Sequence, residues 1–281
     1  MKLSVLLMGC VLLSGSALAM EPDTRRITTA HRVMMGISTL SLYDDYLSAE
    51  PYNGLGLQLN HATSRYPSNR ETRYFFQQDM ELVTASTQNR AGSASMSYTN
   101  IQYAWGALFT LKPFYGIKAA LGPMIGASGG LRMNSRNVNN PINVDLLGDV
   151  QLAGNLTYDF PIGLTTIRLK ASLRAPVLGV QFAPVRGISY YEMLSFGQFE
   201  NAFHLTSFYT KNAWSGQYTV DIPLHTLVVS LGAMHRYSLF KANDMLFKQD
   251  NWSFQVGCTF DLLLFSGASR PNSATYLSLD R

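Results

Sequence analysis

The stretch from Asn143 to Arg174, NVDLLGDVQLAGNLTYDFPIGLTTIRLKASLR, alternates between apolar or small residues and polar residues. Pro161-Ile162-Gly163 divides it into two halves, and the alternation resumes after this tripeptide. A period of two places successive side chains on opposite faces of an extended chain, so each half is predicted to be a β-strand and the tripeptide a turn. Both predicted strands are longer than the roughly 5–6 residues usual in globular sheets.

The same alternation recurs along the rest of the chain and predicts ten strands. They centre on residues 27–40, 55–60, 73–82, 100–109, 115–122, 143–160, 165–174, 201–221, 226–233 and 252–262. The segment 201–221 changes phase part-way, which predicts one long strand with a bulge, with two short strands as the alternative. The sequence shows no internal repeat longer than a hairpin. A single barrel domain is expected over residues 20–265.

Connections of two kinds separate these strands. Short turns are predicted at 65–70, 112–113, 161–163 and 223–224, and longer loops at about 42–53, 87–93, 127–142, 177–198 and 241–250. Short turns at one end and longer loops at the other are typical of transmembrane barrels. Ten strands would return both termini to the periplasmic side.

The composition agrees with a membrane barrel. Of 281 residues, 47% are hydrophobic and only 14% charged, against roughly 25% charged in soluble domains. Beyond residue 20 the longest uninterrupted apolar run is Leu262 to Phe265, far short of a membrane helix. The fold class expected is therefore all-β, an antiparallel up-and-down transmembrane β-barrel of about 10 strands, with 8–12 possible. A soluble barrel or sandwich is the alternative, but the polar stripe holds mostly Gly, Ser, Thr, Asn and Gln rather than charges.

The N-terminus predicts export. Residues 1–19 combine Lys2, an apolar stretch and the small-x-small sequence Ala17-Leu18-Ala19, as expected of a cleaved signal peptide. A short membrane anchor and a lipoprotein box at Cys10 are the alternatives. Export of a barrel without a membrane helix predicts the outer membrane of a Gram-negative cell. Outer-membrane lipid and the barrel-assembly machinery are then the expected partners.

The C-terminus departs from the usual end of such barrels. They commonly end on an aromatic residue that the assembly machinery reads, whereas Phe265 is followed by sixteen residues. Residues 266–281 are predicted to form a polar tail. Removal of Cys10 with the leader would leave Cys258 without an internal disulfide partner.

The polar stripe predicts the content of the lumen. A ten-stranded barrel is only slightly wider than an eight-stranded one, whose interior side chains fill. Opposite charges facing each other there are expected to form a packing network, with a narrow conduit for a small solute or a catalytic use as alternatives. The residues predicted to form this network are Asp79, Glu81, Asp145, Asp149, Arg168, Lys170 and Arg174.

Sequence motifs that would indicate a catalytic or ligand-binding site are weak. The net charge of +4 comes from scattered residues, so nucleic acid is not an expected partner. The sequence Gly126-Ala127-Ser128-Gly129-Gly130 matches G-x-S-x-G, but a strand precedes it without a following helix. The five histidines show no metal-ligand spacing. Catalytic, cofactor and metal residues are therefore not assigned, and no cofactor is expected.

One loop carries a concentrated motif. The sequence DDYLSAEPYNG (Asp44 to Gly54) follows the first predicted strand and, with Tyr43, supplies three tyrosines. These rings are expected to fold over the barrel mouth as a lid or to lie at the membrane interface, with a contact platform for sugar or protein as the alternative. The candidate motif residues are Asp44, Tyr46, Leu47, Ser48, Tyr52 and Gly54.

The order D-x-Y-L-S-x-x-x-Y-x-G in this loop resembles a Bacteroidetes family known only as a domain of unknown function. The resemblance covers roughly residues 25–265. It implies an exported outer-membrane barrel and transfers no catalytic residues.

These observations predict a non-enzymatic protein that binds a partner or has a structural role at the cell surface. Its working surface is expected in the loops 42–53, 127–142 and 177–198. The last loop contributes the aromatic residues Phe182, Tyr190, Tyr191 and Phe196. A narrow channel and an outer-membrane rim hydrolase, either lipase or protease, are the alternatives. The ligand is not specified by the sequence.

Overall fold

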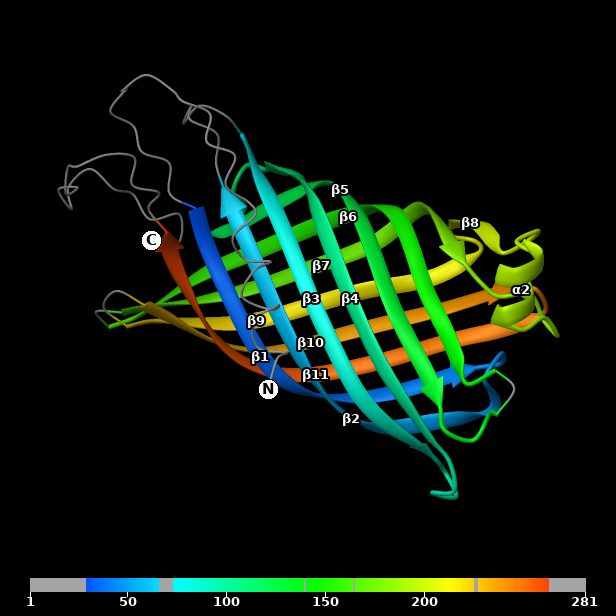
Figure 1. Ribbon diagram of the computed structural model, residues 1–281. Coiled ribbons are helices and arrows are strands. Elements are labelled where there is room, and N and C mark those ends of the chain that lie inside the picture. Colours follow the sequence, from blue (N-terminus) through cyan, green and yellow to red (C-terminus); the bar gives the residue numbers. More distant parts are fainter. Residues whose placement is uncertain (1–28, 66–72, 139, 164, 225–226, 263–281) are drawn as a thin grey trace, which may run out of the picture.

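A computed structural model describes residues 29–65, 73–138, 140–163, 165–224 and 227–262. These residues form eleven strands and one short helix (Figure 1). In chain order they are β1 (Thr29–Asp44), β2 (Ser48–Arg65), β3 (Tyr74–Asn89), β4 (Ser95–Thr110), β5 (Ile117–Asn134), β6 (Ile142–Ile162), β7 (Thr165–Phe182), α2 (Tyr190–Phe196), β8 (Phe203–Ser207), β9 (Lys211–Leu224), β10 (Leu227–Ala242) and β11 (Met245–Leu262).

The strands close into a single antiparallel barrel. Each strand from β1 to β7 pairs with the next, β7 pairs with β9, and β9 leads through β10 to β11. β1 and β11 close the wall in continuous register, from Thr29 opposite Leu262 to Asp44 opposite Phe247. β8 shares one position in the wall with β9, so the barrel has ten strand positions. The predicted all-β, ten-stranded barrel is confirmed.

One strand position is interrupted. β9 pairs with β7 from Arg168 to Arg174, and β8 pairs with β7 from Leu178 to Phe182. Pro176 lies between these two ladders and has no N–H to donate. The chain accordingly leaves the sheet at residues 208–210. The prediction of one long strand with a bulge was wrong, because the segment forms two strands, β8 and β9, as in the alternative.

The two faces of the wall are inverted relative to a soluble barrel. Large apolar side chains point outward and are exposed: Ile37 is 63% and Phe254 72% accessible. Their sequence neighbours point inward and are polar and buried, with Ser38 and Ser253 both at 0%. Aromatic residues mark the end of the barrel that contains Thr29, as predicted for an interfacial girdle. These outward or turn residues are Phe109, Phe114, Tyr115, Tyr158 and Phe160.

The two ends of the barrel differ (Figure 1). The terminal end contains Thr29, Leu262 and the turn 111–116. The α2 end contains the turns 45–47, 90–94, 135–141 and 243–244 together with the segment 183–202. α2 itself begins with a capping box, in which Ser189 and Glu192 exchange hydrogen bonds, and ends at Gly197 in the left-handed region.

The predicted loop boundaries were wrong. Strand structure occupies most of the residues expected in the loops at 42–53, 127–142 and 241–250, so those connections shrink to 45–47, 135–141 and 243–244. The expected loop at 177–198 begins only after β7 ends at Phe182. The reason is that past the apolar belt the apolar residues move from the outward to the inward face, as at Leu42, Tyr52 and Met245, which shifts the phase of the alternation.

Several predictions fall outside the described residues. They are the leader 1–19, the tail 266–281, Phe265 and most of the turn at 65–70. Within the part of the chain that the structure describes, helical segments are too short and too polar to cross a membrane.

Candidate functional site

The β1–β2 turn is organised by one buried carboxylate. Asp44 is fully buried, and its Oδ1 accepts hydrogen bonds from the backbone N–H groups of Tyr46 and Leu47 at 3.1 and 3.3 Å. Its Oδ2 accepts from Arg132 Nη1 at 3.0 Å and from Asn143 Nδ2 at 2.8 Å. Asp44 therefore shapes its own turn and ties β1 to β5 and β6 across the barrel mouth.

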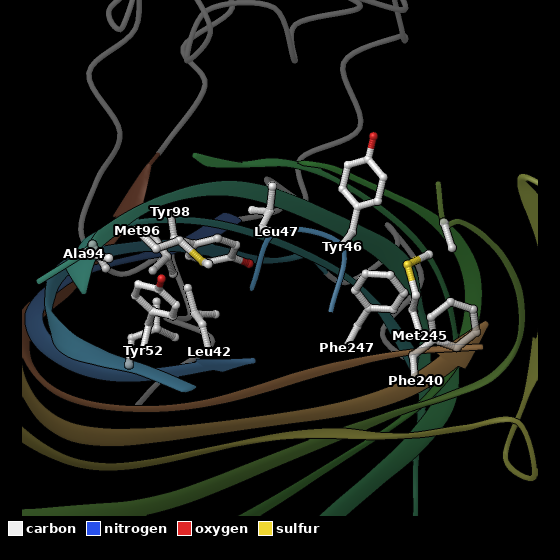
Figure 2. Close-up of a cluster of buried hydrophobic side chains, with 14 of the residues drawn as sticks. Leu42, Tyr46, Leu47, Tyr52, Ala94, Met96, Tyr98, Phe240, Met245 and Phe247 are labelled. Carbon is white, nitrogen blue, oxygen red and sulfur yellow. The ribbon is translucent and has the colours of Figure 1, made fainter. Parts of the chain in front are cut away.

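Apolar side chains fill the mouth around this turn (Figure 2). Tyr46 and Leu47 come from the turn itself, and the others point inward from the ends of the strands. We call this group the mouth cluster. Its larger members are Leu40, Leu42, Tyr46, Leu47, Tyr52, Val83, Met96, Tyr98, Phe240, Met245 and Phe247. These residues are buried inside the ring of strands and occupy the lumen at the α2 end.

The segment 183–202 covers the mouth cluster from outside. Tyr46 donates its hydroxyl to the carbonyl of Ile188 at 3.0 Å, and its ring lies edge-on to Tyr190 with centroids 5.6 Å apart. The Tyr190 hydroxyl donates to Asn143 Oδ1 at 2.8 Å and accepts from the N–H of Val144 at 2.9 Å. Burial, followed by the nearby carboxylates of Asp44 and Glu192, raises the pKa of Tyr46 to about 12.

The structure brings the six predicted motif residues together at this end. Tyr52 donates to Ser48 Oγ at 3.4 Å and accepts from Asn134 Nδ2 at 3.2 Å, so its hydroxyl is buried in the mouth. Gly54 lies against β3, where a Cβ would come within 2.0 Å of the Ser86 carbonyl oxygen. Tyr46 and Tyr52 thus occupy a lid position, whereas Tyr43 donates to Asp45 Oδ1 at 2.8 Å.

The predicted lumen residues lie inside the barrel in separate ion pairs. Arg174 contacts Asp79 at 3.5 Å, and Glu81 pairs with Arg236. Lys170 pairs with Asp221 at 3.0 Å, Arg168 with Asp159 at 2.5 Å, and Asp145 with Arg132 at 2.8 Å. Asp149 accepts a hydrogen bond from Gln151 at 2.7 Å. Among the ion pairs found between described residues, Asp79–Arg174 joins two members of the predicted network directly.

Sequence reasoning missed two important interior cations, Arg132 and Lys211. Arg132 lies on β5 in a stretch expected to be loop, and Lys211 begins β9 where the predicted strand changes phase. Each has an inward position set by the alternation of its own strand. Extending the period-2 pattern through the polar strand ends would have found both residues.

A polar groove remains open at the rim of the mouth. It has a volume of about 480 Å³ and lies between the β1–β2 turn, the β3–β4 turn and the β5–β6 connection. Asn89 donates to Glu50 Oε2 at 2.8 Å, and Asn137 donates to the Leu47 carbonyl at 3.1 Å. The polar side chains that line it are Ser48, Glu50, Asn89, Asn134, Arg136 and Asn137. We call it the rim groove.

Histidine geometry gives little support to a hydrolase. His235 Nε2 lies 2.8 Å from Asp250 Oδ1, and its ring is stacked 4.0 Å from Trp252 and edge-on to Trp214. Among the described residues, no serine or threonine hydroxyl lies within hydrogen-bond distance of His235. Ser128 of the G-x-S-x-G sequence lies within β5, not at a strand-to-helix turn. Groups of His, Cys, Asp or Glu that could hold a metal are not found in the described part of the chain.

Sequence comparison places the chain in a family. The model of the family described as "Protein of unknown function (DUF3316)" matches residues 4–269. The chain belongs to this family. The expected kinship to a family of unknown function is thereby confirmed, while the Bacteroidetes origin stays a prediction. No curated protein matches the sequence.

The chain is also similar to several solved structures of β-barrel proteins. The chain is similar to the outer membrane protease OmpT from Escherichia coli, with 8% identity, a TM-score of 0.41 and coverage of 88% of this chain and 99% of that one. The transport unit of the autotransporter AIDA-I from Escherichia coli gives 10% identity and a TM-score of 0.42, covering 90% and 97%. The translocator domain of NalP from Neisseria meningitidis gives 11% and 0.39, covering 92% and 95%. Identities and scores this low transfer no activity.

Proposed function

We propose that this member of the DUF3316 family is an outer-membrane barrel that does not conduct solutes and that binds a polar partner at the cell surface. The observation that supports this proposal is the mouth cluster. It places buried apolar side chains inside the lumen at the α2 end, while the rim groove beside it stays open. The α2 end would face the outside and the terminal end the periplasm, with the exposed apolar belt in lipid.

The chemistry of the rim groove favours a carbohydrate ligand. The Asn137 amide and the Ser48 hydroxyl offer donors and acceptors, with one carboxylate, Glu50, and one guanidinium, Arg136. This set is almost neutral, and it suits the many hydroxyl groups of a sugar better than a strongly charged partner. Hydrogen bonds from Asn89 to Glu50 and from Arg136 to Ser93 hold the groove in shape before a ligand binds.

Binding of glycans to whole cells tests the proposal. Cells that display the protein should bind members of a glycan array, and the double substitution Asn137→Ala with Arg136→Ala should reduce binding at least tenfold. Lys241→Ala, on the opposite wall of the barrel, is the matched control and should leave binding unchanged. Equal binding by cells lacking the protein would contradict surface recognition.

Conductance separates the proposal from the channel alternative. Because the mouth cluster fills the lumen, purified protein in a planar bilayer should give no steady single-channel steps. Regular steps from the unmodified protein would instead establish a conduit. Fractionation with heat-modifiable gel mobility tests the location, and recovery from the soluble periplasm would overturn the membrane assignment.

A further inference from the structure

A partly enclosed cavity lies inside the half of the barrel nearer the α2 end, below the mouth cluster, and we call it the upper cavity. Its volume is about 100 Å³, and its lining comes from β4, β5, β6, β7, β9, β10 and β11. A second cavity of about 190 Å³ lies nearer the terminal end and is lined by Arg32, Lys118 and Arg168 among others. Arg174 borders the upper cavity, and its contact with Asp79 lies between the two.

Lys211 presents a buried cation without a direct partner to the upper cavity. The residue is 5% exposed, and its ammonium makes no ion pair or hydrogen bond to another described residue. Asp149 and Asp145 attract it through space. Burying an unpaired ammonium is costly, whereas the other cations on this lining, Arg132, Arg174 and Arg236, each contact a carboxylate.

Asp149 presents the opposite charge to the same cavity. It is 7% exposed, and within the described residues its carboxylate contacts Gln151 but no cation at ion-pair distance. Gly126 makes room for it, because a Cβ there would lie 2.3 Å from Asp149 Oδ1. The cavity thus separates one unpaired cation from one unpaired anion.

Neutral groups on the lining are also unsatisfied. Asn100 Oδ1, Gln181 Oε1, Gln249 Nε2 and Arg132 Nε are buried and lack hydrogen-bond partners among the described residues. Buried polar atoms are nearly always hydrogen-bonded. Two of these atoms are hydrogen-bond acceptors and two are donors. A molecule that satisfies them needs both donor and acceptor groups.

We propose that the upper cavity binds a small zwitterion of the amino-acid class. Its carboxylate contacts Lys211, and its ammonium contacts Asp149. The cavity volume suits a molecule about the size of glycine or alanine, which replaces roughly three water molecules at about 30 Å³ each. The site is independent of the rim groove and does not require conduction.

Calorimetry on the full chain in detergent micelles tests this site. Glycine and alanine are the probes, and acetate and methylammonium each carry only one of the two charges. Both amino acids should bind at least tenfold more tightly than either single-charge probe. Lys211→Met should weaken glycine binding at least tenfold, whereas Lys241→Met, an exposed lysine on β10, should not change it. Absence of glycine and alanine binding, or equal effects of the two variants, would overturn the proposal and indicate water alone.

Folding of the variants is checked by heat-modifiable gel mobility. Asp149→Asn provides a second test should Lys211→Met fail to fold, because it keeps the size of the side chain and removes only its charge. This variant should lose the preference for glycine over acetate. Retention of that preference in a folded Asp149→Asn barrel would contradict the assigned orientation.

Discussion

The two ends of the lumen use the same kinds of charge pair in different surroundings. At the α2 end, Asp44 and Arg132 are both almost completely buried and are enclosed by the mouth cluster. At the terminal end, Asp159 contacts Lys118 at 2.7 Å and Arg168 at 2.5 Å, but Lys118 is largely exposed and Asp159 partly so. Water screens the second group and not the first, so burial decides how much each pair contributes to stability.

The largest effect is expected from Asp44→Ala. This change leaves the Arg132 guanidinium with Asp145 alone and removes four hydrogen bonds from the turn and its neighbours. Removing one partner of a buried pair costs about 3–5 kcal/mol. Urea unfolding in micelles should show that loss, and planar bilayers should show openings absent from the unmodified protein. A variant as stable as the parent would mean that Asp44 does not organise the mouth.

Alkaline pH should loosen the α2 end before the rest of the barrel. An unfolded tyrosine has a pKa near 10, whereas burial raises the pKa of Tyr46 to about 12. The stabilising contribution of neutral Tyr46 is therefore complete below about pH 10 and is lost as pH rises through about 12. Bilayer recordings over this range should show openings that grow with pH. Tyr46→Phe, which cannot ionise, should flatten this dependence, and an unchanged profile would assign the effect to another group.

A much smaller effect is expected from Asp159→Asn at the terminal end. Exposed ion pairs contribute about 0–1 kcal/mol and are screened by salt. Urea unfolding at low salt should show at most that loss, and at high salt none. A cost equal to that of Asp44→Ala would remove the distinction between the two ends.

The smallest effect is expected when the carboxylate of Glu192, in the capping box of α2, is protonated. Hydrogen bonds from the Ser189 N–H and hydroxyl lower the pKa of Glu192. A lowered carboxylate pKa stabilises the folded helix above the unfolded pKa, and that stabilisation is lost as pH falls through the folded value. Amide protection factors in 189–197, which correct for the intrinsic pH dependence of exchange, should fall at acid pH. Glu192→Gln should reduce the pH dependence, whereas exchange in β3 should not respond to either change.

The wall of the barrel was predictable because its information is local. Alternation at Asn143 to Arg174 and its repeats determined the strands, their number and the outward direction of the apolar stripe. The interruption at 208–210 was predictable only in part, since a phase change does not distinguish a bulge from a break. Strand ends were not predictable, because beyond the membrane belt the apolar residues move from the outward to the inward face and the phase of the alternation changes.

By itself, the sequence determined an inverted ten-stranded barrel and placed Asp44, Tyr46 and Tyr52 in one motif. Only the tertiary structure decided that Asp44 meets Arg132 from β5, that Tyr46 meets Ile188, and that Lys211 and Asp149 face one cavity without a direct contact. The physical reason is barrel closure. Alternation specifies which face a residue occupies, but the shear and register of ten strands decide which residues meet across the lumen.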